Sequence, residues 1–187
     1  MNAFLKSIHD TQPLSPQSLA AYTGKWEHWT IPKDHLLLRE NEVADHLFFI
    51  GKGIARIYYF KNGKEITEWI AMDNTYFLSI ISFFERTPSK LIIQTIEPSE
   101  VMGIRYDDLM ELCDQYHDIE RLFRKSLTAS LILSQHRMDS IQFESAQQRY
   151  EKLLANNPTI IQRVPLSYIA SWLGITQETL SRIRAII

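Results

Sequence analysis

The residues best suited to chemistry lie near the C-terminus, in the stretch 176–182. Arg182 can donate two parallel hydrogen bonds to a guanine edge, and Glu178 can accept one from a cytosine amino group. Because these residues are four apart, they share one helix face, where Glu178 can also hold Arg182 by a charge-assisted hydrogen bond. We therefore predict contact with a DNA major groove, with the threonines on phosphates. The predicted DNA-contacting residues are Thr176, Gln177, Glu178, Thr179, Ser181 and Arg182.

Residues 165–187 must position these side chains, and their pattern predicts two short helices joined by a tight turn. Gly174 gives the backbone freedom that the corner needs, Ile175 fills the corner, and Thr176 is suited to cap the second helix. The spacing of a small residue at Ala170, then Gly174, then Leu180 is that of a DNA-binding helix-turn-helix. The residues expected to face inward are Ile169, Ala170, Leu173, Leu180, Ile183 and Ile187.

Two simpler interpretations stay open. The stretch 165–187 is also compatible with a plain helical hairpin that buries one face. Glu178 and Arg182 would then be an exposed pair worth about 0.3–0.5 kcal/mol and would bind no partner.

The preceding chain divides into a strand-rich part and a helical part. Between residues 26 and 105, eight short runs rich in aromatic and β-branched residues are separated by turn residues, which predicts a sandwich or rolled barrel. Asn62-Gly63 is a strong hairpin signal within it. From Asp107, an expected helix cap, the apolar period becomes helical, and a helix of over 20 residues is predicted over about 118–141. Ser145 and Gln148 predict a capping box that opens the next helix.

The long helix carries apolar residues at approximately heptad spacing. The pattern fits a seam between two chains, and it also fits a long spine within one core. The predicted seam residues are Phe123, Leu127, Leu131, Ser134, Met138 and Ile141.

Composition narrows the class of protein. The 187 residues carry a net charge of −2, and the segment 143–187 holds five basic and three acidic residues, so it carries +2 and the remainder −4. This uneven distribution of charge suits a C-terminal segment that contacts phosphates. The single cysteine, Cys113, excludes an internal disulfide and fits a reducing compartment, where we expect a small buried thiol. We expect a cytoplasmic protein, because no signal peptide is evident and the most apolar run has nine residues.

The sequence carries no signature of an enzyme or a metal site. No Ser/His/Asp arrangement, glycine-rich phosphate loop or paired-carboxylate pattern is present, and the six histidines have no metal-ligand spacing. We therefore expect a protein that is not an enzyme and binds no metal.

Three motifs in this order resemble the Crp/Fnr family of transcription regulators: LFFIGKGIARIYY (47–59), NGKEIT (62–67) and IASWLGITQETLSRIR (169–184). The ending is similar to that of short members from Bacteroidetes. The resemblance implies an α+β fold with three parts. Residues 1–117 would form a cyclic nucleotide-binding-like β-roll, a jelly-roll-like double-stranded β-helix that acts as a sensor. Residues 118–142 would form a dimerisation helix, and residues 143–187 an all-α helix-turn-helix domain.

The same resemblance implies function. It predicts a homodimeric transcription regulator whose partners are double-stranded DNA, a small-molecule effector and RNA polymerase, with no membrane. It places Glu178 and Arg182 on the base-reading positions, whereas Gln177 stands where the family often has Arg. The family often adds a β-hairpin wing after this helix, and the sequence ends at Ile187, so we expect the wing to be absent or truncated. The alternative is a ligand-binding or protein-interaction module that reads no DNA.

The predicted ligand pocket departs from the family pattern. Cyclic-nucleotide binders use a Glu for the ribose and an Arg-Ser or Arg-Thr pair for the phosphate, and this chain has Ser79 and Ser89-Lys90 there. We therefore expect no tight binding of cyclic AMP. A more apolar ligand, a different anion, or a roll filled by its own side chains all remain open. The candidate pocket residues are Phe77, Ser79, Ser82, Arg86, Ser89 and Lys90.

Overall fold

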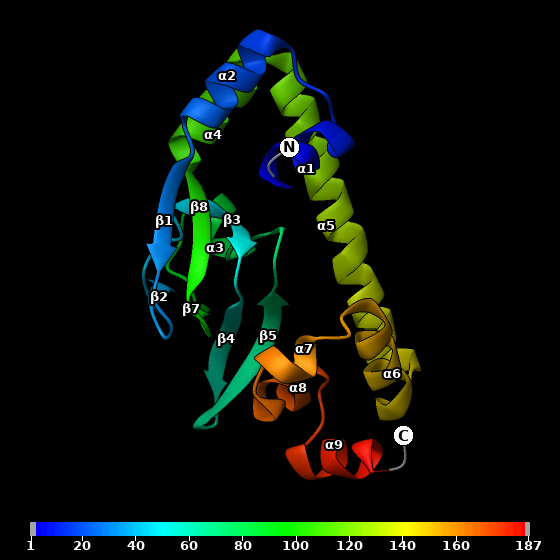
Figure 1. Cartoon of the computed structure of the whole chain (residues 1–187). Helices are drawn as coiled ribbons and strands as arrows, with labels where there is room; N and C mark the ends of the chain where they lie inside the picture. The colour runs from blue at the N-terminus through cyan, green and yellow to red at the C-terminus, as the bar shows by residue number, and fades with distance from the viewer. Residues whose placement is uncertain (1–2, 186–187) are drawn as a thin grey trace.

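The computed structural model describes residues 3–185, and it has a mixed α+β fold (Figure 1). Two N-terminal helices, α1 (Ala3–Thr11) and α2 (Pro16–Gly24), precede a β-roll. Beyond the roll, α4 (Tyr106–Gln115) leads into the long α5 (His117–Phe143). Helix α5 runs from the end that holds α1 and α2 to the end that holds the last helices (Figure 1). None of the described helices has the length and hydropathy needed to cross a bilayer.

The roll consists of two four-stranded antiparallel sheets, with strand orders β1-β8-β3-β6 and β2-β7-β4-β5. This arrangement confirms the predicted eight-stranded roll. The strands are β1 (Glu27–Ile31), β2 (Leu36–Leu38), β3 (His46–Lys52), β4 (Ala55–Lys61), β5 (Lys64–Ala71), β6 (Thr75–Phe77), β7 (Ile92–Thr95) and β8 (Ser99–Arg105).

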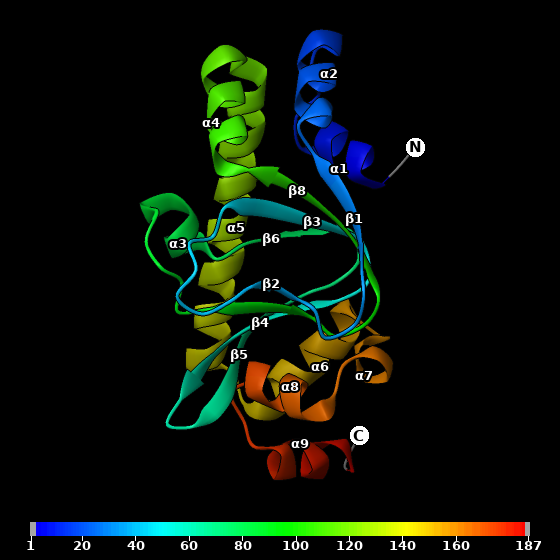
Figure 2. The same cartoon turned by 90° about the vertical axis from the view of Figure 1, so that its left-hand side faces the viewer.

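The β4–β5 hairpin forms where Asn62-Gly63 predicted it. Asn62 and Gly63 both have positive φ, 52° and 73°, as the type I′ turn of a two-residue hairpin requires. Lys61 and Lys64 therefore pair directly across the two strands. The hairpin extends toward the last helices of the chain (Figure 2).

Five further helices complete the fold: α3 (Ile80–Glu85), α6 (Ala146–Asn156), α7 (Ile160–Arg163), α8 (Leu166–Trp172) and α9 (Gln177–Arg184). The short α3 and α7 were not predicted. The predicted capping box of Ser145 and Gln148 is present at α6. The predicted Asp107 cap is wrong, because α4 begins at Tyr106 after Arg105 and Asp107 lies in the first turn. A carboxylate there is still favoured by the helix dipole.

Buried side chains form two cores. The first joins the roll to α1, α2, α4 and the start of α5, and Phe49, Ile104 and Leu109 are among its members. The second joins roll residues Ile54, Ile70 and Ile96 to residues of α6–α9. The helical end therefore packs on the roll through a shared core.

Candidate nucleic-acid interface

Helices α8 and α9 form the predicted corner. Gly174 has φ 69°, a left-handed conformation that favours glycine, and its N–H donates to the Ser171 carbonyl at 3.1 Å. Ile175 packs against the second core, as expected for a residue that fills the corner. The predicted inward residues are buried in this core: Ile169, Ala170, Leu173, Leu180 and Ile183. Ile187, also expected to face inward, lies outside the described residues.

Thr176 caps α9 as predicted. Its Oγ1 accepts a hydrogen bond from the Thr179 N–H at 3.2 Å, which satisfies one of the free donors at the helix start. The two threonine hydroxyl oxygens are also 3.2 Å apart. Both hydroxyls are thus used within the helix start, and a phosphate contact from either would be additional to these bonds.

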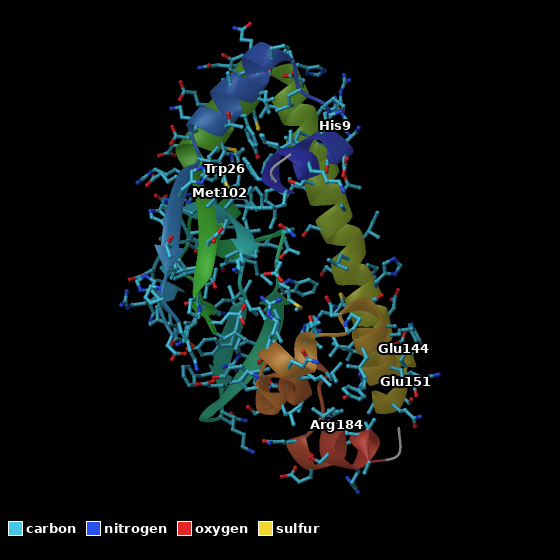
Figure 3. All side chains as sticks on the ribbon, in the orientation of Figure 1. His9, Trp26, Met102, Glu144, Glu151 and Arg184 are labelled. Atoms are coloured by element: carbon cyan, nitrogen blue, oxygen red, sulfur yellow. The ribbon has the colours of Figure 1, made fainter. Side chains whose placement is uncertain are left out.

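The opposite face of α9 is polar and exposed. Gln177, Glu178, Ser181 and Arg182 are all exposed, and Arg184 extends the basic character of the last turn. Helix α9 lies at the end of the molecule opposite α1, as the labelled Arg184 and His9 show (Figure 3). The geometry brings four of the predicted DNA-contacting side chains onto one accessible face.

The expected hydrogen bond between Glu178 and Arg182 is not formed. Arg182 Nη2 instead donates to Thr179 Oγ1 at 3.3 Å, because the i−3 hydroxyl lies within reach. The pKa of the Glu178 carboxyl is lowered, first by a side-chain hydrogen bond with Thr176 and then by the charges of Arg182 and Lys64. Glu178 is exposed, and its carboxylate can accept a hydrogen bond from a base amino group.

The basic residues of the segment 143–187 differ in whether protein groups already bind them or leave them available to DNA. Arg149 donates to the carbonyls of Leu173 and Glu144, and Lys152 pairs with the Glu144 carboxylate. Arg163 pairs with Asp73 and Glu97 of the roll. Among the described residues of this segment, Arg149, Arg182 and Arg184 form no ion pair, and of these three Arg182 and Arg184 are exposed.

Specific polar contacts tie α7 and α8 to the roll. Arg163 Nη2 donates to Glu97 at 2.5 Å and to Asp73 at 3.0 Å, and this bonding lowers the pKa of the Asp73 carboxyl. The Thr67 N–H of β5 donates to Ser171 Oγ of α8 at 2.8 Å, beside the contacting rings of Trp69 and Trp172.

The least expected contacts between the roll and α8 are those of Arg56 in β4. It is 1% exposed, and its Cζ lies 4.3 Å from the Tyr58 ring centroid and 3.7 Å from that of Tyr168 on α8. Its Nε donates to Thr67 Oγ1 at 2.8 Å, and Nη1 donates to Glu65 at 2.5 Å. The role of Arg56 was not predicted, although a lone charge inside the apolar run 54–58 is a detectable signal of a buried ionic contact.

The predicted seam residues lie along α5, where every residue from 127 to 136 is exposed. Leu131 is 70% exposed, and Phe123 differs from the rest because it packs against the first core beside Phe84. The exposed apolar residues of α5 are Leu127, Leu131, Ile132, Leu133, Met138, Ile141 and Phe143. Ser134 is also exposed.

The candidate pocket residues separate into two groups. The buried Ser79 and Ser89 meet, with their Oγ atoms 3.0 Å apart, and Ser89 Oγ also accepts from the Leu91 N–H. Ser82 Oγ donates to the Thr87 carbonyl at 2.6 Å and accepts from the Ala44 N–H at 2.8 Å. Phe77 stacks on Phe48.

The charged candidates are directed elsewhere. Arg86 donates to the Ala44 carbonyl at 2.8 Å and to Asp45 at 2.6 Å, and it covers the Tyr106 ring. Lys90 is exposed. Two surface hollows occur elsewhere, one over β1, β8 and β3 and one between the roll and α7, and no candidate pocket residue lines either.

Among residues 3–185, no three His, Cys, Asp or Glu side chains gather in a way that could hold a metal ion.

Fold and site together define a class of protein: a roll of two antiparallel sheets, joined by a long helix to a helix-turn-helix end. Residues 28–116 match the family model of the cyclic nucleotide-binding domain. No curated protein matches the chain.

Solved structures extend the likeness beyond the roll. FixK2 from Bradyrhizobium japonicum is 16% identical, with a TM-score of 0.73 over 86% of this chain and 83% of that one. The c-di-GMP responsive global regulator CLP from Xanthomonas campestris is 16% identical, with a TM-score of 0.69 over 90% and 89%. A Crp/Fnr-family structure from Eubacterium rectale is 16% identical, with a TM-score of 0.69 over 91% and 82%.

The chain thus has a cyclic nucleotide-binding-type roll and the fold of Crp/Fnr regulators. The resemblance seen in the sequence is confirmed at this level. The similarity to Bacteroidetes members stays a prediction.

Proposed function

We propose that the protein is a homodimeric, sequence-specific DNA-binding transcription regulator whose roll does not bind cyclic AMP tightly. The observation that carries the proposal is the exposed face of α9, with Glu178, Ser181 and Arg182 beside a correctly formed corner. A helix in this setting can enter a major groove about 12 Å wide and present its first turns to base edges.

The state of α5 supports the homodimer. Ten consecutive residues, 127–136, are exposed in the single chain, and apolar side chains lie among them. An isolated helix gains little stability from propensity alone, so such a stretch needs a surface to pack on. The heptad spacing of Leu127, Leu131, Met138 and Ile141 fits the same stretch of a second copy.

The hydrogen bonds of the candidate pocket support weak binding of cyclic AMP. A cyclic phosphate needs a cation and free donors directed at it. Ser79 and Ser89 bond to each other, and Arg86 bonds to Asp45 and to a carbonyl. No residue of this set combines a positive charge with a position inside the roll. A different effector, and a contact with RNA polymerase, remain compatible with the fold.

Selection from random duplex DNA tests the proposal. The expected product is a near-palindromic site whose half-sites lie about one helical turn, ~34 Å, apart. Calorimetry with cyclic AMP should show no binding at micromolar concentrations, and native mass spectrometry should show a dimer. Failure to enrich any sequence would contradict DNA reading.

The second candidate is a ligand-binding or protein-interaction module that reads no DNA. The buried contacts between α8 and the roll favour this candidate, because they join the helical end and the roll into one rigid unit. Salt separates the two, because affinity that depends on phosphate contacts falls steeply with salt concentration. Binding to DNA that is weak and independent of sequence would favour this second candidate.

A further inference from the structure

The tip of the β4–β5 hairpin carries two lysines whose placement is unusual. Lys61 and Lys64 are exposed and face each other across the strands on either side of the turn. Like charges directly opposite in an antiparallel pair are destabilising, so local stability alone does not explain this choice. The neighbouring Glu65 does not neutralise them through an ion pair, because its carboxylate is bonded to Arg56.

The hairpin tip points toward the end of the molecule that holds α9 (Figures 1 and 2). Both views show the hairpin reaching past the body of the roll to the level of the start of α9 (Figures 1 and 2). Contacts further along β5 fix this approach, since Thr67 bonds Ser171 and Trp69 packs on Trp172. Lys64 is close enough to the Glu178 carboxyl to contribute to its lowered pKa. The hairpin tip, where Lys61 pairs with Lys64, therefore lies toward the start of α9.

A helix with its side chains is about 10–12 Å across, so it fills a major groove about 12 Å wide. A group beside the start of such a helix then faces one of the two phosphate rows that border the groove. Lysine is a compact charge that suits a phosphate row. Among the described residues of the segment 143–187, Arg182 and Arg184 are the exposed cations that form no ion pair, so this segment alone offers few positive charges to a phosphate backbone.

We propose that the tip of the β4–β5 hairpin is a second DNA-contacting element, in which Lys61 and Lys64 bind the phosphates that flank the groove read by α9. This inference rests on the proposed function and extends it, because it assigns part of the DNA-binding surface to the sensor roll. The hairpin contacts carry affinity without sequence preference. The roll and α9 then both contact the same DNA duplex.

The test measures DNA affinity of the full-length chain against salt concentration, on a site selected by the wild-type protein. Each phosphate contact contributes about 0.9 to the slope of log affinity against log salt. Lys61→Gln with Lys64→Gln should lower the steepness by roughly two to four for a dimer, with the base preference unchanged. Lys61→Arg with Lys64→Arg should restore the slope. The matched control is Lys6→Gln with Lys33→Gln, two exposed lysines on α1 and in the β1–β2 connection.

The outcomes separate the two proposals. A slope for the hairpin variant equal to that of the control variant, with sequence-specific binding intact, would overturn the hairpin contact and leave the proposed function standing. A changed base preference would also overturn it, because phosphate contacts carry no sequence information. Absence of DNA binding by the wild-type chain would overturn both. Thermal unfolding of each variant, followed by circular dichroism, verifies that the fold is retained.

Discussion

The contact between Arg56 and Tyr168 should couple the roll to the helical end. Replacing Arg56 with Met keeps the aliphatic stem and removes the guanidinium, and replacing Tyr168 with Leu removes the ring. A cation over an aromatic ring in a desolvated site is worth about 2 kcal/mol, and Arg56 is 1% exposed with its Cζ 3.7 Å from the ring centroid. Loss of the donor to Thr67 adds about 1 kcal/mol to the Arg56→Met variant. Glu65 is 42% exposed and can return to water, so its loss of a partner adds little.

Urea unfolding of the wild type, the two single variants and the double variant completes a double-mutant cycle. We expect Arg56→Met to cost about 2–4 kcal/mol and the coupling between the two sites to be about 2 kcal/mol. Leu153→Ala, on a different helix of the same core, supplies the control cycle and should add to Arg56→Met within about 0.5 kcal/mol. A coupling below about 0.5 kcal/mol for Arg56 and Tyr168 would refute the contact as the link between roll and helical end.

Three further predictions follow from other contacts. Leu131→Asp should convert a dimer to a monomer in sedimentation experiments, because it places a charge in the predicted seam. The protomer should stay folded, since Leu131 is 70% exposed in the single chain. An unchanged dimer would exclude Leu131 from the seam. Burial raises the pKa of the Cys113 thiol to about 11. Its reaction with a disulfide reagent at pH 8 should therefore be roughly two orders of magnitude slower in the folded protein than in urea. Equal rates would show an accessible thiolate. The hydrogen bond from Arg163 lowers the pKa of Asp73, so the carboxylate stabilises the fold above its unfolded pKa of about 4, and this contribution is lost as the pH falls through the lower folded value. The gap in unfolding free energy between wild type and Asp73→Asn should therefore stay constant from pH 7 to pH 5 and shrink below pH 4, and a gap that widens on acidification would be contrary to this assignment.

Local patterns predicted much of this fold because the responsible interactions are local. Single turns require the positive φ values of Asn62, Gly63 and Gly174. Only a few residue types adopt such values at low energetic cost, so the sequence reveals these turns. The capping box of α6 needs only a serine and a glutamine three residues apart. The alternation and period of apolar residues similarly predicted the eight strands and the long helix.

The remaining features depend on contacts between distant parts of the chain. Nothing near Arg163 indicates that Asp73 and Glu97, 90 and 66 residues away, will neutralise it. The expected bond from Arg182 to Glu178 had the right spacing, and Thr179 accepts the guanidinium bond instead. Spacing predicts which side chains share a face, and it does not decide which of two acceptors within reach is used.

Whether α9 reads bases is tested most directly by one set of affinities. Wild type and Arg182→Ala are each titrated with the selected duplex and with duplexes that change one base pair at a time. We expect a change at one base pair in each half-site to cost the wild type about 1–3 kcal/mol of binding free energy. Arg182→Ala should bind equally well whichever base pair stands there, and should keep its other base preferences. The same base-pair profile for both proteins would contradict base reading by α9.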